Sequence, residues 1–205
     1  MGVKAIIFDL GGIIINLQAQ ACYQEFASRV SSKGEFDEIV AVCHRYEQGE
    51  VNDSQFLALI AHHASLSKNK AKELWNSMLL NIPKERIKLI QELKKTHRVY
   101  LLSNTNKIHV DTVNQLLQKD FGINSLDQLF HDVFLSYELG CRKPDQMIYK
   151  KVLSMIPENA NECLFIDDAE ENAKGAEKVG IKGVYINTEI QSVNDWFASQ
   201  FELAE

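Results

Sequence analysis

Short hydrophobic runs alternate along this chain with longer stretches in which hydrophobic residues recur every three or four positions. The short runs are apolar at consecutive positions, which is typical of strands buried on both faces of a parallel sheet. The longer stretches have the period of amphipathic helices. Together they predict an α/β fold, a doubly wound, Rossmann-like parallel sheet of five strands. The predicted strands contain residues 6–8, 99–102, 133–135, 163–166 and 184–186.

The interval between the first two strands is about ninety residues long, far more than one crossover helix needs. Its apolar spacing predicts four helices, so we expect an all-helical insertion over residues 17–81. Residues 1–16 and 82–205 would then form the α/β core. The predicted helices cover residues 18–30, 35–47, 53–65 and 69–80 in the insertion, and 83–95, 145–155 and 170–179 in the core.

Composition and charge restrict the class of protein further. A chain of 205 residues can form one substantial core with a small inserted domain. The net charge of −6 and the lack of a basic cluster argue against a nucleic-acid partner. The chain contains no run of eighteen apolar residues, so no membrane span is expected. The apolar run near the N-terminus contains Asp9, which indicates a buried strand rather than a signal peptide. The four cysteines have no paired spacing, which predicts reduced thiols and a cytoplasmic location.

Polar residues follow the predicted strands at the edge where open α/β sheets bind ligands. Three carboxylates gathered there would repel one another, and Mg²⁺ is the natural counter-ion because it prefers oxygen ligands. A lysine and a hydroxyl beside the metal would bind an anion such as phosphate. The first carboxylate could then attack phosphorus and form an aspartyl-phosphate. The residues at this edge are Asp9, Ser103, Asn104, Lys143, Asp167 and Asp168.

Four separated segments give the chain a recognisable pattern. In order, they are Ile6–Gly12, Leu102–Asn104, Arg142–Pro144, and Phe165–Asp168 with Asn172 behind it. With these segments the whole chain resembles the haloacid dehalogenase-like (HAD) hydrolase superfamily. The resemblance is closest to the branch with β-phosphoglucomutase-like phosphatases and the phosphatase domain of soluble epoxide hydrolases. The helical insertion is similar to the C1 cap of that family. The resemblance implies a Mg²⁺-dependent phosphatase acting on a small phosphorylated metabolite.

The resemblance also implies roles for the residues that match its motifs. Asp9 would be the nucleophile and a metal ligand, and Lys143 would stabilise both the nucleophile and the transferring group. Ser103 and Asn104 would form the phosphate site, with Asn104 supporting the backbone there. The remaining matches are Asp168 as a Mg²⁺ ligand, Asp167 as a ligand or a support beside it, and Asn172 as the residue that orients their loop.

Gly11 is where the chain departs from the family pattern. The phosphatases of the family usually have Asp here, which binds the metal through its backbone carbonyl and serves as general acid and base through its side chain. Glycine keeps the carbonyl and loses the proton transfer, a loss worth about 10²–10⁴ in rate. We therefore expect substrates whose leaving group needs little protonation: anomeric sugar phosphates, acyl phosphates or aryl phosphates, with a sugar phosphate favoured. Alternatively, a residue of the cap supplies the proton; the candidates are His44, Glu47, Glu50 and Asp53.

Other interpretations stay open at this point. The chain could be a catalytically impaired relative that binds a phosphorylated ligand. It could also be a metal-independent haloacid dehalogenase, although the acidic pair Asp167-Asp168 argues against this because such enzymes have no cation to neutralise it. That pair could also cap the helix that follows it. Arg142 is interpreted as a surface charge, and the histidines as surface or partly buried residues.

Overall fold

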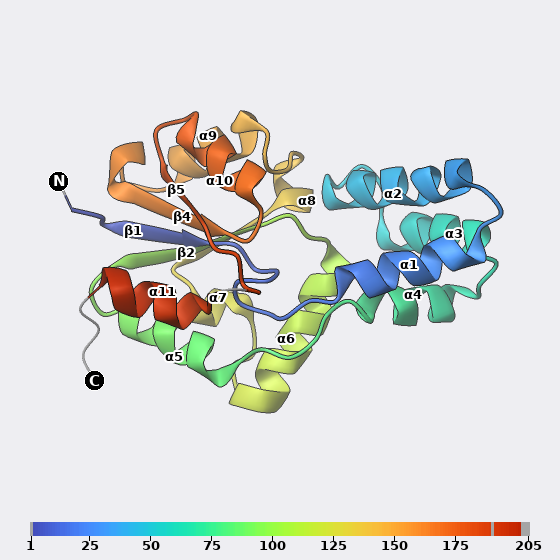
Figure 1. The fold of residues 1–205 in the computed structure, drawn as a ribbon, viewed down its shortest axis with the longest axis horizontal. Helices are drawn as coiled ribbons and strands as arrows, with labels where there is room; N and C mark the ends of the chain where they lie inside the picture. The colour runs from blue at the N-terminus through green and yellow to red at the C-terminus, as the bar shows by residue number, and fades with distance from the viewer. Residues whose placement is uncertain (1, 190, 202–205) are drawn as a thin grey trace.

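A five-stranded parallel sheet forms the centre of the fold (Figure 1). The computed structural model describes residues 2–189 and 191–201. The strand order is β3-β2-β1-β4-β5, and Ile7 of the central strand pairs in register with Tyr100 on one side and Phe165 on the other. The predicted fold class is confirmed. The strands are β1 (Ala5–Phe8), β2 (Arg98–Ser103), β3 (Asp132–Leu135), β4 (Cys163–Asp167) and β5 (Lys182–Tyr185).

Alternate residues of β1 pack against different layers of helices. Ile6 and Phe8 belong to one hydrophobic cluster, Ala5 and Ile7 belong to another, and none of the four is exposed. This burial on both faces explains why the strand appears in the sequence as an unbroken apolar run. The first layer contains α5 (Lys84–Leu93), α6 (Lys107–Phe121), α7 (Leu126–Leu129) and α11 (Val193–Gln200). The second contains α9 (Gln146–Met155) and α10 (Glu170–Glu177), with α8 (Ser136–Leu139) and the 3₁₀ turn η1 (Ala160–Glu162) in the connections.

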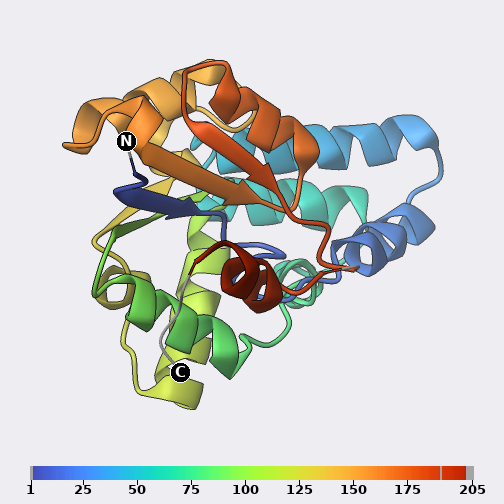
Figure 2. The same cartoon turned by 60° about the vertical axis from the view of Figure 1, so that its left-hand side comes forward.

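Four helices between β1 and β2 form a separate bundle beyond the carboxyl ends of the strands (Figures 1 and 2). Its hydrophobic cluster includes Phe56, whose ring stacks on Tyr46 with centroids 4.1 Å apart. The predicted capping box at the start of the third helix is present, because Asn52 and Gln55 exchange side chain-to-backbone hydrogen bonds of 2.9 and 3.0 Å. The helices are α1 (Ala19–Arg29), α2 (Lys33–Glu47), α3 (Asp53–His63) and α4 (Lys68–Asn76).

The hydrophobic pattern did not predict the core helices α6 and α11, nor the one-turn helices α7 and α8. In α6 the buried face of Ile108, Val113 and Leu117 also contains the buried His109, and this polar residue weakens the apolar period. The helix begins after Asn106, whose side chain accepts a hydrogen bond of 3.0 Å from the backbone N–H of His109. Because polar residues precede and begin α6, the start of this helix cannot be recognised from the apolar pattern.

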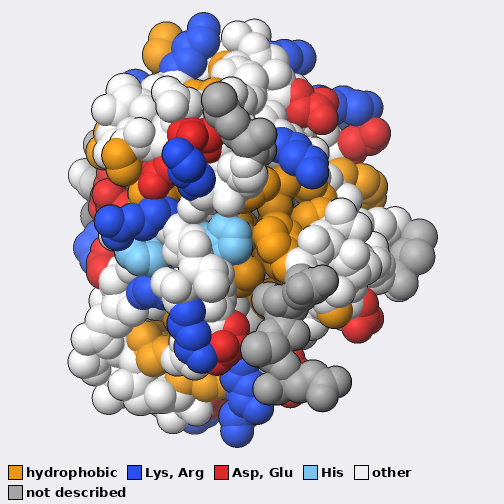
Figure 3. All heavy atoms as spheres, turned by 90° about the vertical axis from the view of Figure 1, so that its left-hand side faces the viewer, with side chains coloured by type: hydrophobic (Ala, Val, Ile, Leu, Met, Phe, Trp, Pro, Cys, Tyr) orange, Lys and Arg blue, Asp and Glu red, His pale blue; other side chains and the backbone are white. Residues whose placement is uncertain are grey.

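The remaining surface and the cysteines add little chemistry. All four cysteines are buried and unpaired. Along the described part of the chain, no helix combines the length and the apolar character needed to cross a membrane. On the face away from the helical bundle, Lys and Arg side chains are interspersed with Asp and Glu around a hydrophobic area (Figure 3). The polar groups that can do chemistry lie at the opposite end, where the strands meet the bundle.

Candidate active site

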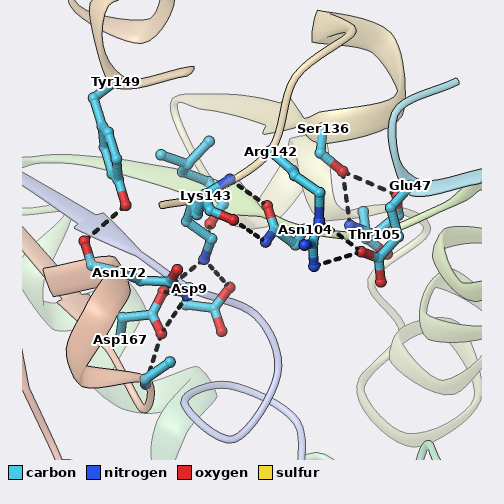
Figure 4. Close-up of polar contacts among 12 residues, drawn as sticks. Asp9, Glu47, Asn104, Thr105, Ser136, Arg142, Lys143, Tyr149, Asp167 and Asn172 are labelled. Carbon is cyan, nitrogen blue, oxygen red and sulfur yellow. Dashed lines mark hydrogen bonds and ion pairs between the residues drawn. The ribbon is translucent and has the colours of Figure 1, made fainter. Parts of the chain in front are cut away.

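Lys143 joins the strand ends at the centre of the candidate site (Figure 4). Its Nζ lies 2.6 Å from Oδ1 of Asp9 and 2.6 Å from Oδ2 of Asp167, and it donates a third hydrogen bond of 3.1 Å to the carbonyl of Leu102. Only 1% of the lysine side chain is exposed. Three segments that are far apart in the sequence therefore place their ionic groups in one buried cluster.

Asn104 fixes the backbone of the loop that carries this lysine. Its Nδ2 donates to the carbonyl of Lys143 at 3.0 Å, and its Oδ1 accepts from the N–H of Lys143 at 2.8 Å. Both ends of the amide are used in this pair of bonds. The geometry thus favours the supporting role of Asn104 over direct phosphate binding, and it leaves the buried Ser103 at the end of β2 as the hydroxyl next to the site.

Asp167 is held by donors on several sides. Asn172 Nδ2 donates to both of its carboxylate oxygens at 3.0 and 3.1 Å, and the N–H of Ala169 donates to Oδ1 at 2.8 Å. Tyr149 in turn donates its hydroxyl to the carbonyl of Asn172 at 2.7 Å. Asp167 therefore uses one carboxylate both to bind the backbone just before α10 and to orient Lys143.

Three carboxylates of the site are close enough to share a cation. Oxygens of Asp9, Asp167 and Asp168 all lie within 4.8 Å of one another. Burial raises the pKa of Asp9 to about 7, and the charges of the other two carboxylates add to this rise. The charge of Lys143 acts in the opposite direction and lowers this pKa. Burial, with the charge of Asp167, raises the pKa of Asp168 to about 6. A hard divalent cation would relieve this repulsion, so the donor set fits Mg²⁺.

Gly12 allows Asp168 to approach the loop after β1. A Cβ at residue 12 would lie 2.0 Å from Oδ2 of Asp168, and the backbone of Gly12 has a φ of +70°. Atoms cannot come this close, and L-residues rarely adopt this φ. Glycine at this position therefore lets the carboxylate of Asp168 point toward Asp9.

The variant Gly12→Ala is expected to bind Mg²⁺ about 10- to 100-fold more weakly, because the methyl group displaces a carboxylate of the site. The matched control is Gly122→Ala. Gly122 has a nearly equal φ of +69° but nothing within 4 Å of its Cβ position, so it carries the backbone cost alone. Titration of Mg²⁺ followed by calorimetry compares the two variants. Equal Mg²⁺ affinities in both variants would contradict the role of Gly12.

A cavity of about 180 Å³ lies beside Asp9, between the sheet edge and the helical bundle. Leu10 and Gly11, which follow Asp9 directly in the chain, form part of its floor, and a Cβ at residue 11 would lie 3.9 Å from Oδ2 of Asp9. The rest of the floor comes from the residues that end β2, namely Ser103, Asn104 and Thr105. The opposite wall is mostly apolar and contains Leu17, Tyr23, Trp75, Met78 and Leu79.

Of the four bundle residues considered as proton donors, Glu47 lines this cavity. Its carboxylate lies 3.0 Å from the guanidinium of Arg142, whose side chain is 30% exposed, so Arg142 forms an ion pair with a cavity residue rather than being an unpaired surface charge. Burial raises the pKa of Glu47, while Arg142 lowers it. The other three do not line the cavity: His44 and Glu50 are exposed, and Asp53 accepts a hydrogen bond of 2.7 Å from a tyrosine hydroxyl.

The sequence did not single out the aromatic part of the cavity wall. Tyr23 and Trp75 occur at the helical spacing of bundle-core residues, and nothing in that pattern marks residues that face a cavity. His109 is only 6% exposed, so the expectation of a surface or partly buried histidine is wrong there. Its ring stacks on Trp75, its two nitrogens lie 3.2 Å from the carbonyl of Trp75 and from the amide of Asn106, and burial lowers its pKa to about 4. His109 is therefore a neutral structural residue near pH 7.

The chain is similar to several known proteins over most of its length. A D-ribitol-5-phosphate phosphatase from Bacteroides thetaiotaomicron is 23% identical, with 88% of this chain and 90% of the relative covered. A sesquiterpene phosphatase from Aspergillus oryzae is 25% identical, with 89% of each covered. Among solved structures, a HAD family enzyme of B. thetaiotaomicron in a magnesium complex is 30% identical, with 91% of this chain and 94% of that chain covered and a TM-score of 0.78.

A family model that matches most of the chain identifies the family. The family model of the haloacid dehalogenase-like hydrolases matches residues 3–180, which include the ionic cluster of Asp9, Lys143 and Asp167 and the floor of the cavity. The parallel sheet, the polar groups at its carboxyl edge and this match agree. The chain belongs to the haloacid dehalogenase-like hydrolase family.

Proposed function

We propose that this protein is a Mg²⁺-dependent phosphatase that hydrolyses the phosphate monoester of a small metabolite through an aspartyl-phosphate on Asp9. The observation that carries the proposal is the buried contact of 2.6 Å between Asp9 and Lys143, beside two further carboxylates and a cavity. Two relatives support it, because both are named as phosphatases. The B. thetaiotaomicron enzyme supports the metal and the anion, since its structures include a complex with magnesium and inorganic phosphate.

In this proposal the carboxylate of Asp9 is held ready for attack. Lys143 binds Oδ1, and no described residue donates to Oδ2, which would form the new bond to phosphorus as the bond to the ester oxygen breaks. Water then attacks the aspartyl-phosphate, releases phosphate and restores Asp9. The hydroxyl of Ser103 would bind an oxygen of the phosphate group.

Asp9, Asp168 and the backbone carbonyl of Gly11 would hold Mg²⁺, with Asp167 beside them. When bound, the metal would neutralise negative charge on the phosphate group. Asp167 and Asn172 would keep Lys143 and the metal loop in place. Residues 17–81 would act as the cap that covers the cavity, and residues 1–16 and 82–205 as the catalytic core.

The alcohol part of the substrate differs between the relatives, since one is named for ribitol phosphate and the other for sesquiterpenes. Phosphate is the element common to both names. The relatives therefore leave the alcohol open between the sugar phosphate that the sequence favours and an apolar ester. Gly11 adds a condition on the leaving group, because no side chain at this position can protonate it.

The test is a phosphatase screen of wild type and Asp9→Asn with and without Mg²⁺. We expect wild type to hydrolyse acetyl phosphate only with Mg²⁺ and Asp9→Asn to lose at least about 10⁴ in kcat, since the nucleophile is removed. Asp111→Asn is the matched control, because it makes the same change at an exposed carboxylate outside the site. Full activity of Asp9→Asn would show that the nucleophile is wrongly assigned. Turnover of a haloacid without metal, or Mg²⁺ and phosphate binding without any turnover, would favour the two alternative functions.

A further inference from the structure

The cavity beside Asp9 has the size and the lining of a site for one aromatic ring. Its volume is about 180 Å³, and an apolar protein cavity of about 150 Å³ accommodates benzene. Leu17, Tyr23 and Met78 contribute apolar surface opposite the strand ends. A ring attached to the phosphate would thus extend from the carboxylate of Asp9 toward the cap and bury its surface there.

Several of the polar groups around the cavity are already paired within the protein. Glu47 is bound to Arg142, and both nitrogens of His109 are hydrogen-bonded. The N–H of Thr105 donates to the hydroxyl of Ser136 at 3.0 Å. The several hydroxyl groups of a sugar would lose their water on entering this mostly apolar space and would not all gain equivalent partners, which is unfavourable. The lining therefore favours an apolar group over a polyol.

The surroundings of Gly11 limit the leaving group in the same direction. A Cβ at residue 11 would lie 2.6 Å from Cδ1 of Leu17, so this leucine packs where a side chain at residue 11 would begin. With no acid at residue 11, and with the carboxylate of Glu47 held in an ion pair by Arg142, the ester oxygen departs as an anion or takes its proton from water. Phenols have a pKa of about 10, as for the tyrosine side chain, and their anions leave far more readily than alkoxides.

We propose that the preferred substrates are aryl phosphates, the phosphate monoesters of single-ring phenols. This inference rests on the proposed phosphatase function and specifies its substrate class. Asp9 Oδ2 bonds to phosphorus while the aryl oxygen–phosphorus bond breaks. The phenolate departs with its ring in the cavity, and solvent protonates its oxygen on release. Water then hydrolyses the aspartyl-phosphate to phosphate and free Asp9.

The test compares kcat/KM for phenyl phosphate, cyclohexyl phosphate and ribitol 5-phosphate, with acetyl phosphate as the substrate that lacks a ring. We expect phenyl phosphate to exceed both cyclohexyl phosphate and ribitol 5-phosphate by at least tenfold. Inhibition of acetyl phosphate hydrolysis measures binding alone: phenylphosphonate is expected to bind at least about tenfold more tightly than methylphosphonate, from burial of the ring. In Leu17→Asn this ratio is expected to fall several-fold, and Leu17 is 37% exposed, so the fold tolerates the change.

The outcomes separate this inference from the function on which it rests. If wild type hydrolyses acetyl phosphate but prefers ribitol 5-phosphate, or binds both phosphonates equally, the aryl assignment is overturned and the phosphatase remains. If no phosphate ester or acyl phosphate is hydrolysed, the phosphatase proposal fails. Calorimetric titration of the two phosphonates into the Mg²⁺-loaded protein then still tests the cavity, because equal affinities would overturn the ring site.

Discussion

The variant Lys143→Met is expected to lose about 10²–10³ in kcat and about 3–5 kcal/mol of unfolding free energy at pH 8. The lysine lies between two buried carboxylates at 2.6 Å from each, and methionine has nearly the same length without the charge. Its removal leaves Asp9 and Asp167 facing each other without a cation. The loss of rate follows because Lys143 would also stabilise the negative charge that develops on the transferring phosphate.

The destabilisation should depend on pH in a defined direction. The pKa of Asp9 is raised to about 7 in the folded protein, above its ordinary value of 3.8. A carboxyl shifted this way makes the fold less stable as the pH rises from about 4 through about 7. Lys143 limits that effect, and without it the carboxyl is protonated up to a still higher pH. The loss of unfolding free energy caused by Lys143→Met should therefore be smaller at pH 5, where the proton neutralises Asp9, than at pH 8.

Urea unfolding of the metal-free protein at both pH values measures this difference. Lys107→Met is the matched control, since Lys107 forms an exposed ion pair of 2.8 Å with Asp111 that is worth at most about 1 kcal/mol. A variant that is unfolded at pH 8 and folded at pH 5 would agree with the expectation. An equal loss of unfolding free energy at the two pH values would mean that Lys143 does not offset the charge of these carboxylates.

The sequence correctly predicts the features that depend on local patterns of residues. Strands buried on both faces appear as apolar runs, and the length of the interval after Phe8 requires an insertion of some kind. The carboxyl-edge rule then predicts that residues following different strands come together. Asp9, Lys143 and Asp167 do lie in one cluster, with distances of 2.6 Å that no pattern could provide.

The features that the sequence does not reveal depend on contacts between distant residues. Arg142 pairs with Glu47, which lies 95 positions away, and neither belongs to a motif that indicates the other. Asn104 matches a family motif, but only the structure shows that its amide is bound to the backbone of Lys143. Tyr23 is equally compatible with a bundle core and with a cavity wall, because both require an apolar helix face.

The double variant Gly11→Asp with Leu17→Ala is expected to raise kcat for alkyl phosphates by about 10² or more, by restoring a general acid next to the reacting groups. A side chain at residue 11 would begin 3.9 Å from Oδ2 of Asp9, so a carboxyl there can reach the leaving oxygen. Gly11→Asp alone should give a smaller gain, because its Cβ would lie 2.6 Å from Cδ1 of Leu17 and one side chain must move. Leu17→Ala alone is the control for the space created.

The rate increase should depend on the leaving group, and this dependence distinguishes proton transfer from a general improvement of the site. Phenolate and acetate leave without protonation, so kcat for phenyl phosphate and acetyl phosphate should change little in the double variant, while kcat for cyclohexyl phosphate rises. The same carboxylate would activate water in the second step, so the aspartyl-phosphate seen by intact mass after mixing with acetyl phosphate should persist longer in wild type than in the double variant. An equal rise for all three substrates would exclude Gly11 as the reason for slow turnover. A rise confined to the poor leaving group would show that the glycine, with Leu17 above it, determines which esters this active site can cleave.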